Sequence, residues 1–149
     1  MPEQRHYTRL FARAARRGPA PWPQTHRVGG EEESMPIITK YLFVASMDVD
    51  PDKEKLFNEV YDTEHVPNLL KVPGVHAVTR VKGEPFAVRL GGAEQQVTHT
   101  GPRYSALYEI EGPHVLVSAA WAEAVEQGRW PSQVRPYTRN RHHALYQIC

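Results

Sequence analysis

Residues 37–74 read IITKYLFVASMDVDPDKEKLFNEVYDTEHVPNLLKVPG, and this stretch decides the fold. Residues 37–47 are rich in β-branched and aromatic side chains. Both alternating faces of this segment are apolar, which predicts a strand that is covered on two sides. Asp50 then provides a helix N-cap, and Pro51 occupies the first helical position. The stretch therefore encodes a strand followed by a helix.

The predicted helix carries an apolar stripe that ends at a histidine. Its apolar residues are spaced as on one helical face: Leu56, Phe57, Val60 and Tyr61. One further turn along that face reaches His65. Pro67 has no amide hydrogen and disfavours helical geometry at the preceding residue, so we expect the helix to kink or pause there. Pro73-Gly74 ends it.

Three further strands and a second helix follow. Residues 75–81 alternate as a second strand, residues 104–111 form a third, and the closing residues 137–149 contain a fourth. Helical spacing before the fourth strand is set by Val117, Ala120, Trp121, Ala124 and Val125, with Gly128 as the C-terminal cap. Residues 85–101, around Gly91-Gly92, predict a hairpin with a primed turn, with a mobile loop as the alternative.

This order of elements predicts an α+β, ferredoxin-like fold, with two helices on one face of an antiparallel four-stranded sheet. The strands carry apolar side chains on both faces, and no third long helix is available as a cover. We therefore expect a homodimer packed sheet to sheet into an α/β barrel. The alternative is a monomer shielded by the N-terminal arm and the 85–101 insert.

Whole-chain composition excludes several classes of protein. The 149 residues make one domain, and 18 basic against 17 acidic side chains leave a formal charge of +1, which favours neither nucleic acid nor a membrane surface. The one cysteine, Cys149, is the last residue, which rules out an intrachain disulfide framework and fits a reducing compartment. No apolar run is long enough to cross a bilayer. We expect a soluble, cytoplasmic protein.

Residues 1–34 differ from the rest of the chain. They are rich in arginine and proline and poor in aliphatic residues, so we expect a disordered extension. Residues 29–33, GGEEE, are encoded by purine-dominated codons that resemble a bacterial ribosome-binding site, and Met35 follows closely. A translation start at Met35 is the favoured reading, which leaves residues 35–149 as the folded domain.

Four segments carry a family likeness: FNEVYDTEHVPNLLKVPGVHAVTRV, PRYSALYEIEGPHVL, AWAEAV and RNRHHALYQI. Together they resemble the dimeric α/β barrel superfamily, and within it EthD-like proteins. The likeness covers residues 37–149, and its most specific element is the pattern aromatic-acid-x-acid-His-x-Pro at the helix end. The 85–101 insert departs from the short loop that the family has there.

The resemblance implies a ferredoxin-like monomer that dimerises through its sheet and holds a pocket between helices and sheet. Relatives include cofactor-independent monooxygenases, polyketide cyclases, muconolactone-type isomerases and haem-binding members. Fold analogy does not choose among these activities.

His65 and Tyr61 are the candidate catalytic residues. An imidazole on the inward stripe titrates near neutrality and can move a proton, and Asp62 and Glu64 are placed to orient it or to raise its pKa. The alternative is that His65 caps carbonyls freed by Pro67. The Tyr61 phenol is a hydrogen-bond donor for a substrate carbonyl, or else a core residue.

Further aromatic residues are candidates for substrate binding: Tyr41, Phe43, Phe57, Tyr108 and Tyr146. Trp121 is expected in the core. His142 and His143 are adjacent in a strand and point to opposite faces, so they do not chelate one metal ion, although either one could face the pocket. Arg139 and Arg141 are expected on a solvated face or an intersubunit rim. We expect no metal and no cofactor, with haem on a single histidine as an open alternative.

These observations favour a small-molecule enzyme that acts on an apolar cyclic or aromatic carbonyl compound through His65. The reaction is an isomerisation, a cyclisation or a cofactor-independent oxygenation, and whether the chain is an enzyme at all stays open from sequence. The alternatives are a homodimer that binds a hydrophobic metabolite without transforming it, and a purely structural dimer module.

Overall fold

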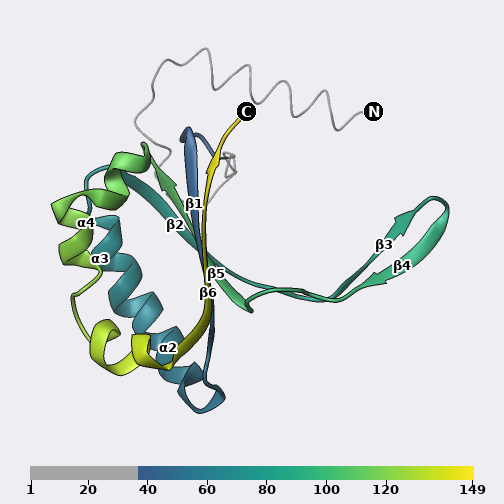
Figure 1. Ribbon diagram of the computed structural model, residues 1–149, viewed down its shortest axis with the longest axis horizontal. Coiled ribbons are helices and arrows are strands. Elements are labelled where there is room, and N and C mark those ends of the chain that lie inside the picture. Colours follow the sequence, from purple (N-terminus) through teal and green to yellow (C-terminus); the bar gives the residue numbers. More distant parts are fainter. Residues whose placement is uncertain (1–36) are drawn as a thin grey trace, which may run out of the picture. The chain divides into compact units, whose positions relative to one another are not determined.

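The computed structural model describes residues 37–149, and the expectations for residues 1–34 lie outside the described residues. The chain divides after Ile38, and the unit Thr39–Cys149 contains all the regular elements described below (Figure 1). Its strands are β1 (Tyr41–Val49), β2 (Val75–Lys82), β3 (Phe86–Leu90), β4 (Ala93–Val97), β5 (Tyr104–Ile110) and β6 (Thr138–Gln147). Its α-helices are α2 (Glu54–Val60), α3 (Val66–Leu70) and α4 (Ala119–Ala124).

Four strands form one antiparallel sheet in the order β2-β5-β1-β6. The two long strands of this sheet, β1 and β6, pair with Ala45 opposite His143, and β1 pairs with β5 with Ala45 opposite Ala106. All the helices lie on one face of the sheet (Figure 1). This is the ferredoxin-like α+β fold predicted from the sequence.

Short turns of 3₁₀- and π-helix link and extend the α-helices. A 3₁₀ turn (Pro51–Lys53) precedes α2, and a π turn (Tyr61–His65) joins α2 to α3. A second 3₁₀ turn (Pro113–Val117) precedes α4, and a π turn (Trp130–Val134) followed by a 3₁₀ turn (Arg135–Tyr137) leads into β6. Asp50 occupies the N-cap position and Pro51 follows at the start of the turn, as predicted, but the Asp50 side chain makes no capping hydrogen bond.

The core lies between the sheet and the helices. Alternate residues of β5 are buried on the helix-covered face: Tyr104, Ala106, Tyr108 and Ile110. Phe57, Val60 and Leu69 cover them from the helices and have almost no exposed surface. Burying each such large side chain contributes about 1.5–3 kcal/mol, so this layer is the main source of stability.

The second helix is shorter than the sequence predicts. Val117 does not belong to its buried stripe, because its side chain is 85% exposed at the end of the 3₁₀ turn. Ser118 has extended backbone geometry, and its Oγ accepts a hydrogen bond from the Trp121 amide at 3.1 Å. Ser118 is therefore an N-cap that starts α4 afresh, and the amphipathic stripe begins only at Ala120.

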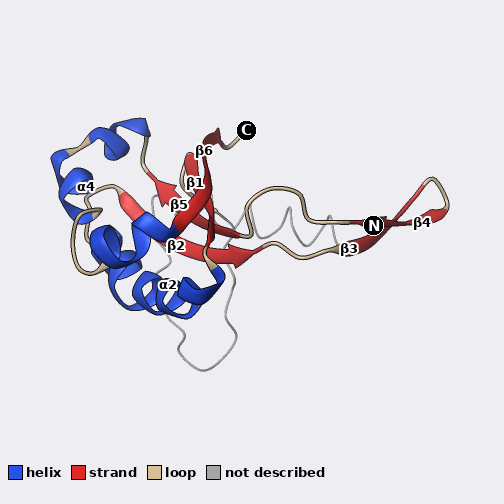
Figure 2. Cartoon of the chain, turned by 60° about the horizontal axis from the view of Figure 1, so that its bottom comes forward, coloured by secondary structure: helices blue, strands red, loops and turns tan. Residues whose placement is uncertain are grey.

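The hairpin prediction for residues 85–101 is confirmed. Gly91 and Gly92 join β3 to β4 with φ values of 60° and 81°, the two positive values that a primed turn requires. The two strands form a sheet of their own, outside the four-stranded sheet (Figure 2). Most of their residues are exposed.

No helix within residues 37–149 covers the second face of the four-stranded sheet (Figure 1). The strand registers place Leu42, Val44 and Leu107 together on this face, and all three are half-buried. Tyr146 and Val81 extend the same face on the edge strands and are 54% and 44% exposed. The outer sheet face therefore carries a partly exposed apolar patch, beside the polar side chains of Ser46, Ser105 and Glu109.

Candidate functional site

The predicted catalytic histidine, His65, is the last residue of a π turn, and its side chain is buried in the core. The amide of Val66 donates to the carbonyl of Tyr61, five residues earlier, instead of to the residue four before it. Pro67 explains this wide turn, since its ring has no N–H and collides with the carbonyl four residues before it in regular α-helix geometry. The expected pause at Pro67 thus takes the form of a π turn with no break in the helix. Tyr61 and His65 both lie on its buried side.

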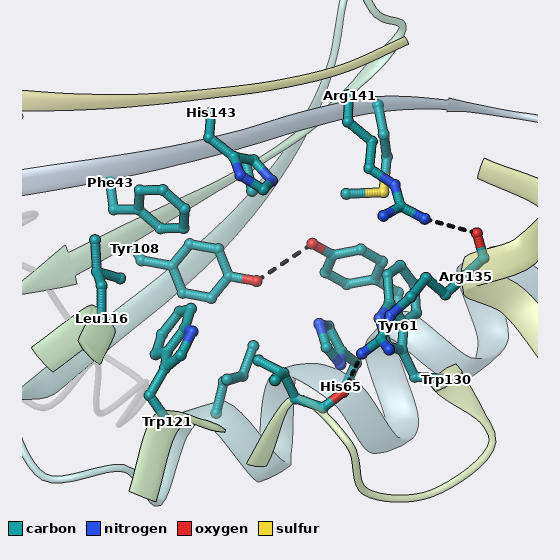
Figure 3. A pocket seen from close by; sticks show the side chains of 14 residues that line it. Phe43, Tyr61, His65, Tyr108, Leu116, Trp121, Trp130, Arg135, Arg141 and His143 are labelled. Carbon is teal, nitrogen blue, oxygen red and sulfur yellow. Dashed lines mark hydrogen bonds between the residues drawn. The ribbon is translucent and has the colours of Figure 1, made fainter. Parts of the chain in front are cut away.

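A cavity of about 430 Å³ lies between the sheet and the helices (Figure 3). Its size is that of a small-molecule site. The sheet contributes Phe43, Ala45, Met47, Tyr108, Arg141 and His143, and the helical side contributes Tyr61, His65, Leu69, Leu116, Trp121, Val125, Trp130 and Arg135. The lining is mainly aromatic and aliphatic, with the polar groups concentrated on a few side chains.

The His65 ring is held by aromatic contacts. It stacks on Trp130 with ring centroids 4.2 Å apart and an angle of 20°, and it meets Tyr61 edge-on at 5.1 Å. The side chain is 5% exposed, and its Nδ1 is buried without a hydrogen-bond partner. Such an orphaned polar atom destabilises a fold by about 1–3 kcal/mol. Nδ1 therefore does not cap a carbonyl freed by Pro67.

Burial lowers the pKa of His65 from 6.5 to about 4, and the nearby Arg135 cation lowers it further in the same direction. The imidazole is therefore neutral at pH 7. The expectation that Asp62 and Glu64 raise this pKa is wrong, because both acids point away from the ring. Asp62 accepts a hydrogen bond from Arg80 at 2.7 Å, and Glu64 accepts from the Arg129 amide at 3.0 Å.

Two phenols lie across the cavity from each other. The hydroxyls of Tyr61 and Tyr108 are 3.2 Å apart and form a buried hydrogen bond (Figure 3). Burial raises the pKa of both, so both keep their protons at neutral pH. The pair carries two hydroxyl hydrogens, and its mutual bond uses one of them. The second is available to an acceptor such as a carbonyl oxygen.

One end of the cavity is basic. Arg135 donates to the Val125 carbonyl at 2.8 Å and pairs with Glu126 at 2.9 Å. Arg141 donates to Thr138 Oγ1 at 2.7 Å and to the backbone oxygen of Arg135 at 2.8 Å. None of the side chains that line the cavity, all of which are described, is an aspartate or a glutamate.

The structure brings together four of the seven residues predicted for the site. Tyr61, His65, Phe43 and Tyr108 line the cavity. Phe57 lies outside the lining, in the core, where its ring contacts Tyr61 at 5.3 Å. Tyr41 packs against the core without reaching the cavity, and Tyr146 lies on the outer sheet face.

The prediction missed several lining residues. Trp121 was expected in the core but borders the cavity, and Trp130 provides the stacking surface for His65. Arg141 is exposed, as expected of a solvated face, but it also lines the cavity. His143, one of the two histidines for which a place at the pocket was left open, lines the cavity as well. The alternation of a strand was the available signal, since residues 141 and 143 share a face in β6.

Within residues 37–149, no three His, Cys, Asp or Glu side chains cluster in a way that could hold a metal ion. In the same range, no helix has the length and apolarity needed to traverse a membrane. His65 and His143 are the two imidazoles in the lining, and His143 lies at 5.5 Å from the Phe43 ring. Burial lowers the pKa of His143 as well, followed by the charge of Arg141.

Comparison with known proteins gives a likeness in structure and none in sequence. No family model matches the chain, and no curated protein matches it. The fold is similar to the crystal structure of an ethyl tert-butyl ether d (EthD) family protein from Bacillus halodurans C-125. The match has a TM-score of 0.48 and 9% sequence identity, and it covers 73% of this chain and 99% of the other.

Proposed function

We propose that this chain is an EthD-like small-molecule enzyme that acts on an apolar cyclic or aromatic carbonyl compound by proton transfer. The observation that carries the proposal is the His65 imidazole, which lines the cavity, is neutral at pH 7 and leaves Nδ1 without a partner. A buried polar atom without a partner calls for an explanation, and catalysis is a frequent one.

The proposed step is proton abstraction next to a carbonyl group. His65 takes a proton from the substrate carbon, and the electron pair of the broken C–H bond moves toward the carbonyl oxygen. The hydroxyl hydrogen that the Tyr61–Tyr108 bond does not use donates a hydrogen bond to this oxygen and stabilises its negative charge. Return of the proton to another carbon completes an isomerisation. In a cyclisation the carbanion attacks a second carbonyl, and the alkoxide that forms takes the proton back from His65. Transfer of its electrons to dioxygen would begin an oxygenation.

The aromatic lining supports a flat, apolar substrate. Phe43, Tyr108 and Trp121 lie within 6 Å of one another by ring centroids on the side of the cavity away from the arginines. Exchange of water for such a surface favours apolar ligands over polar ones.

Proton exchange tests the catalytic proposal without knowledge of the natural product. Cyclic and aromatic ketones are incubated with the protein in D₂O, and NMR follows deuterium uptake at carbons next to the carbonyl. A general base contributes about 10²–10⁴-fold, so His65→Gln should lose most of the catalysed exchange and Tyr61→Phe a smaller part. His114→Gln, which changes an exposed histidine outside the cavity lining, is the matched control. Equal exchange in the native protein and in His65→Gln would reject the role of His65.

The second candidate is a homodimer that binds a hydrophobic metabolite without transforming it. One observation favours it: an imidazole whose pKa is about 4 is a weak base at neutral pH. A ligand that native mass spectrometry detects in the purified protein, and that is recovered unchanged after long incubation, would support this function over catalysis.

We also infer that the chain forms a homodimer through the outer sheet face. Its apolar side chains, Leu42, Val44, Leu107, Val81 and Tyr146, support this inference because apolar area without a cover favours association.

A further inference from the structure

Arg141 has unused hydrogen-bonding capacity at the cavity. A guanidinium carries five N–H donors. Nε donates to Thr138 Oγ1, and Nη2 donates to Thr138 Oγ1 and to the Arg135 carbonyl. Three donors are thus committed to neutral oxygens. The two donors on Nη1 have no acceptor among residues 37–149.

Arg141 is also the exception among the arginines of the described chain. The six others, Arg80, Arg89, Arg103, Arg129, Arg135 and Arg139, each lie within ion-pair distance of a carboxylate. Arg141 has no acidic partner in residues 37–149, and its two acceptors carry no formal charge. Every arginine in this range except Arg141 therefore has an acidic partner, including Arg135, the other arginine of the cavity lining.

The surroundings of Arg141 do not offset its charge. The cavity lining, all of it within residues 37–149, contains no carboxylate, and the ion pair that Arg135 makes with Glu126 leaves Arg141 as the unpaired cation of the lining. Thr138 and the Arg135 carbonyl fix the plane of the Arg141 guanidinium, so its remaining edge is held in place before a ligand arrives. A fixed guanidinium edge suits a carboxylate, which it binds with charge-assisted hydrogen bonds.

The apolar side chains lie at the other end of the cavity. Figure 3 shows Arg141 and Arg135 on one side, and Phe43, Leu116 and Trp121 on the other. His65 and the Tyr61–Tyr108 pair lie between these two ends.

We propose that the ligand of this cavity is an aromatic or alicyclic carboxylate whose carboxylate group binds Arg141 while its ring occupies the Phe43–Trp121 end. This inference rests on the proposed small-molecule function of the same cavity and deepens it by naming the charge of the substrate. The reacting carbonyl group is then held between the two ends, beside His65.

Matched pairs of carboxylates and carboxamides test the charge requirement. The probes are benzoate, phenylacetate and cyclohexanecarboxylate, each compared with its neutral amide by isothermal calorimetry on the full chain. Charge-assisted hydrogen bonds are about twice as strong as neutral ones, so we expect at least one carboxylate to bind about 10–100-fold more tightly than its amide. Arg141→Gln should remove this preference, and Arg141→Lys should retain part of it.

Arg139→Gln is the control variant, because Arg139 is two residues away in β6, pairs with Asp50 and does not line the cavity. It should keep the preference for carboxylates. Thermal melting of all variants separates loss of binding from loss of folding.

Three results would overturn the inference: no preference for the carboxylate in any of the three pairs, a preference that survives Arg141→Gln, or tighter binding of inorganic phosphate than of any carboxylate. The outcomes for the two proposals remain distinct. A carboxylate preference without His65-dependent proton exchange supports the ligand class and rejects the catalytic role. His65-dependent proton exchange on neutral ketones, without a preference for carboxylates, supports the catalytic role and rejects the ligand class.

Discussion

At the scale of single residues, His65 combines burial with an unpaired nitrogen. The stacked Trp130 and the edge-on Tyr61 hold the ring without hydrogen bonds, so its place in the fold is decided by packing. A leucine would fill much of the same apolar space without an orphaned polar atom. The imidazole therefore lowers the stability of the fold locally, and packing alone does not explain why a histidine occupies this position.

This destabilisation should depend on pH. The pKa of His65 is about 4 in the folded chain and near 6.5 in the unfolded chain. Between these values the unfolded chain binds a proton that the folded chain does not, so the free energy of unfolding falls as the pH falls from 6.5 to 4. The loss amounts to about 3 kcal/mol, at roughly 1.4 kcal/mol per pKa unit.

His65→Leu should remove this dependence. Urea unfolding at pH 7 and at pH 4 should show a smaller loss of stability in the variant than in the native chain, by about 3 kcal/mol. At pH 7 the variant should be at least as stable, since no unpaired nitrogen remains. The same loss in both proteins would show that the ring is not buried as a neutral group.

At the scale of elements, the helices that border the cavity are short and depend on local devices. Helix α4 has six residues and begins at Ser118, which accepts from the Trp121 amide and also donates to the Val115 carbonyl at 2.7 Å. A helix of this length is not stable by propensity alone. Its cap and its packing therefore hold Trp121 at the cavity.

Ser118→Ala should lower the free energy of unfolding by about 1 kcal/mol, the usual contribution of an N-cap. Thermal or urea unfolding measures the change. Ser132→Ala is the control, because this serine is exposed in the π turn and caps no helix. If both variants were equally stable, the bond from the Trp121 amide to Ser118 would not contribute.

The sequence predicts these elements unevenly, for physical reasons. Strand alternation and the glycine pair at residues 91 and 92 identify the sheet and the hairpin, because both signals are local. The restart of the helix at Ser118 escaped prediction, since Val117 continues the helical spacing although its side chain is exposed. The stacking of Trp130 on His65 joins residues 65 apart, and no local pattern encodes it. The basic end of the cavity was not predicted, because the sequence does not show which arginines have a carboxylate partner in the folded chain.

At the scale of the whole molecule, the open side of the sheet determines the proposed assembly. One face is covered by helices, while the other carries half-buried Leu42, Val44 and Leu107. Sedimentation velocity should therefore give the mass of two chains. Val81→Glu combined with Tyr146→Glu should shift the protein to one chain, because both side chains are exposed on this face and charge there opposes association.

Val117→Glu is the control for this experiment. Val117 is more exposed than either residue, but it lies at the end of the 3₁₀ turn before α4 and not on the outer sheet face. It should leave the mass unchanged. A native chain that sediments as one copy at micromolar concentration would reject the homodimer.

The stack between His65 and Trp130 gives the protein a built-in optical reporter. Indole fluorescence is quenched more strongly by imidazolium than by neutral imidazole, and the two rings lie 4.2 Å apart. Any event that protonates His65 should dim the emission of Trp130. A titration with acid or with a bound compound could then be read from the unlabelled chain, with Trp130→Phe as the blank.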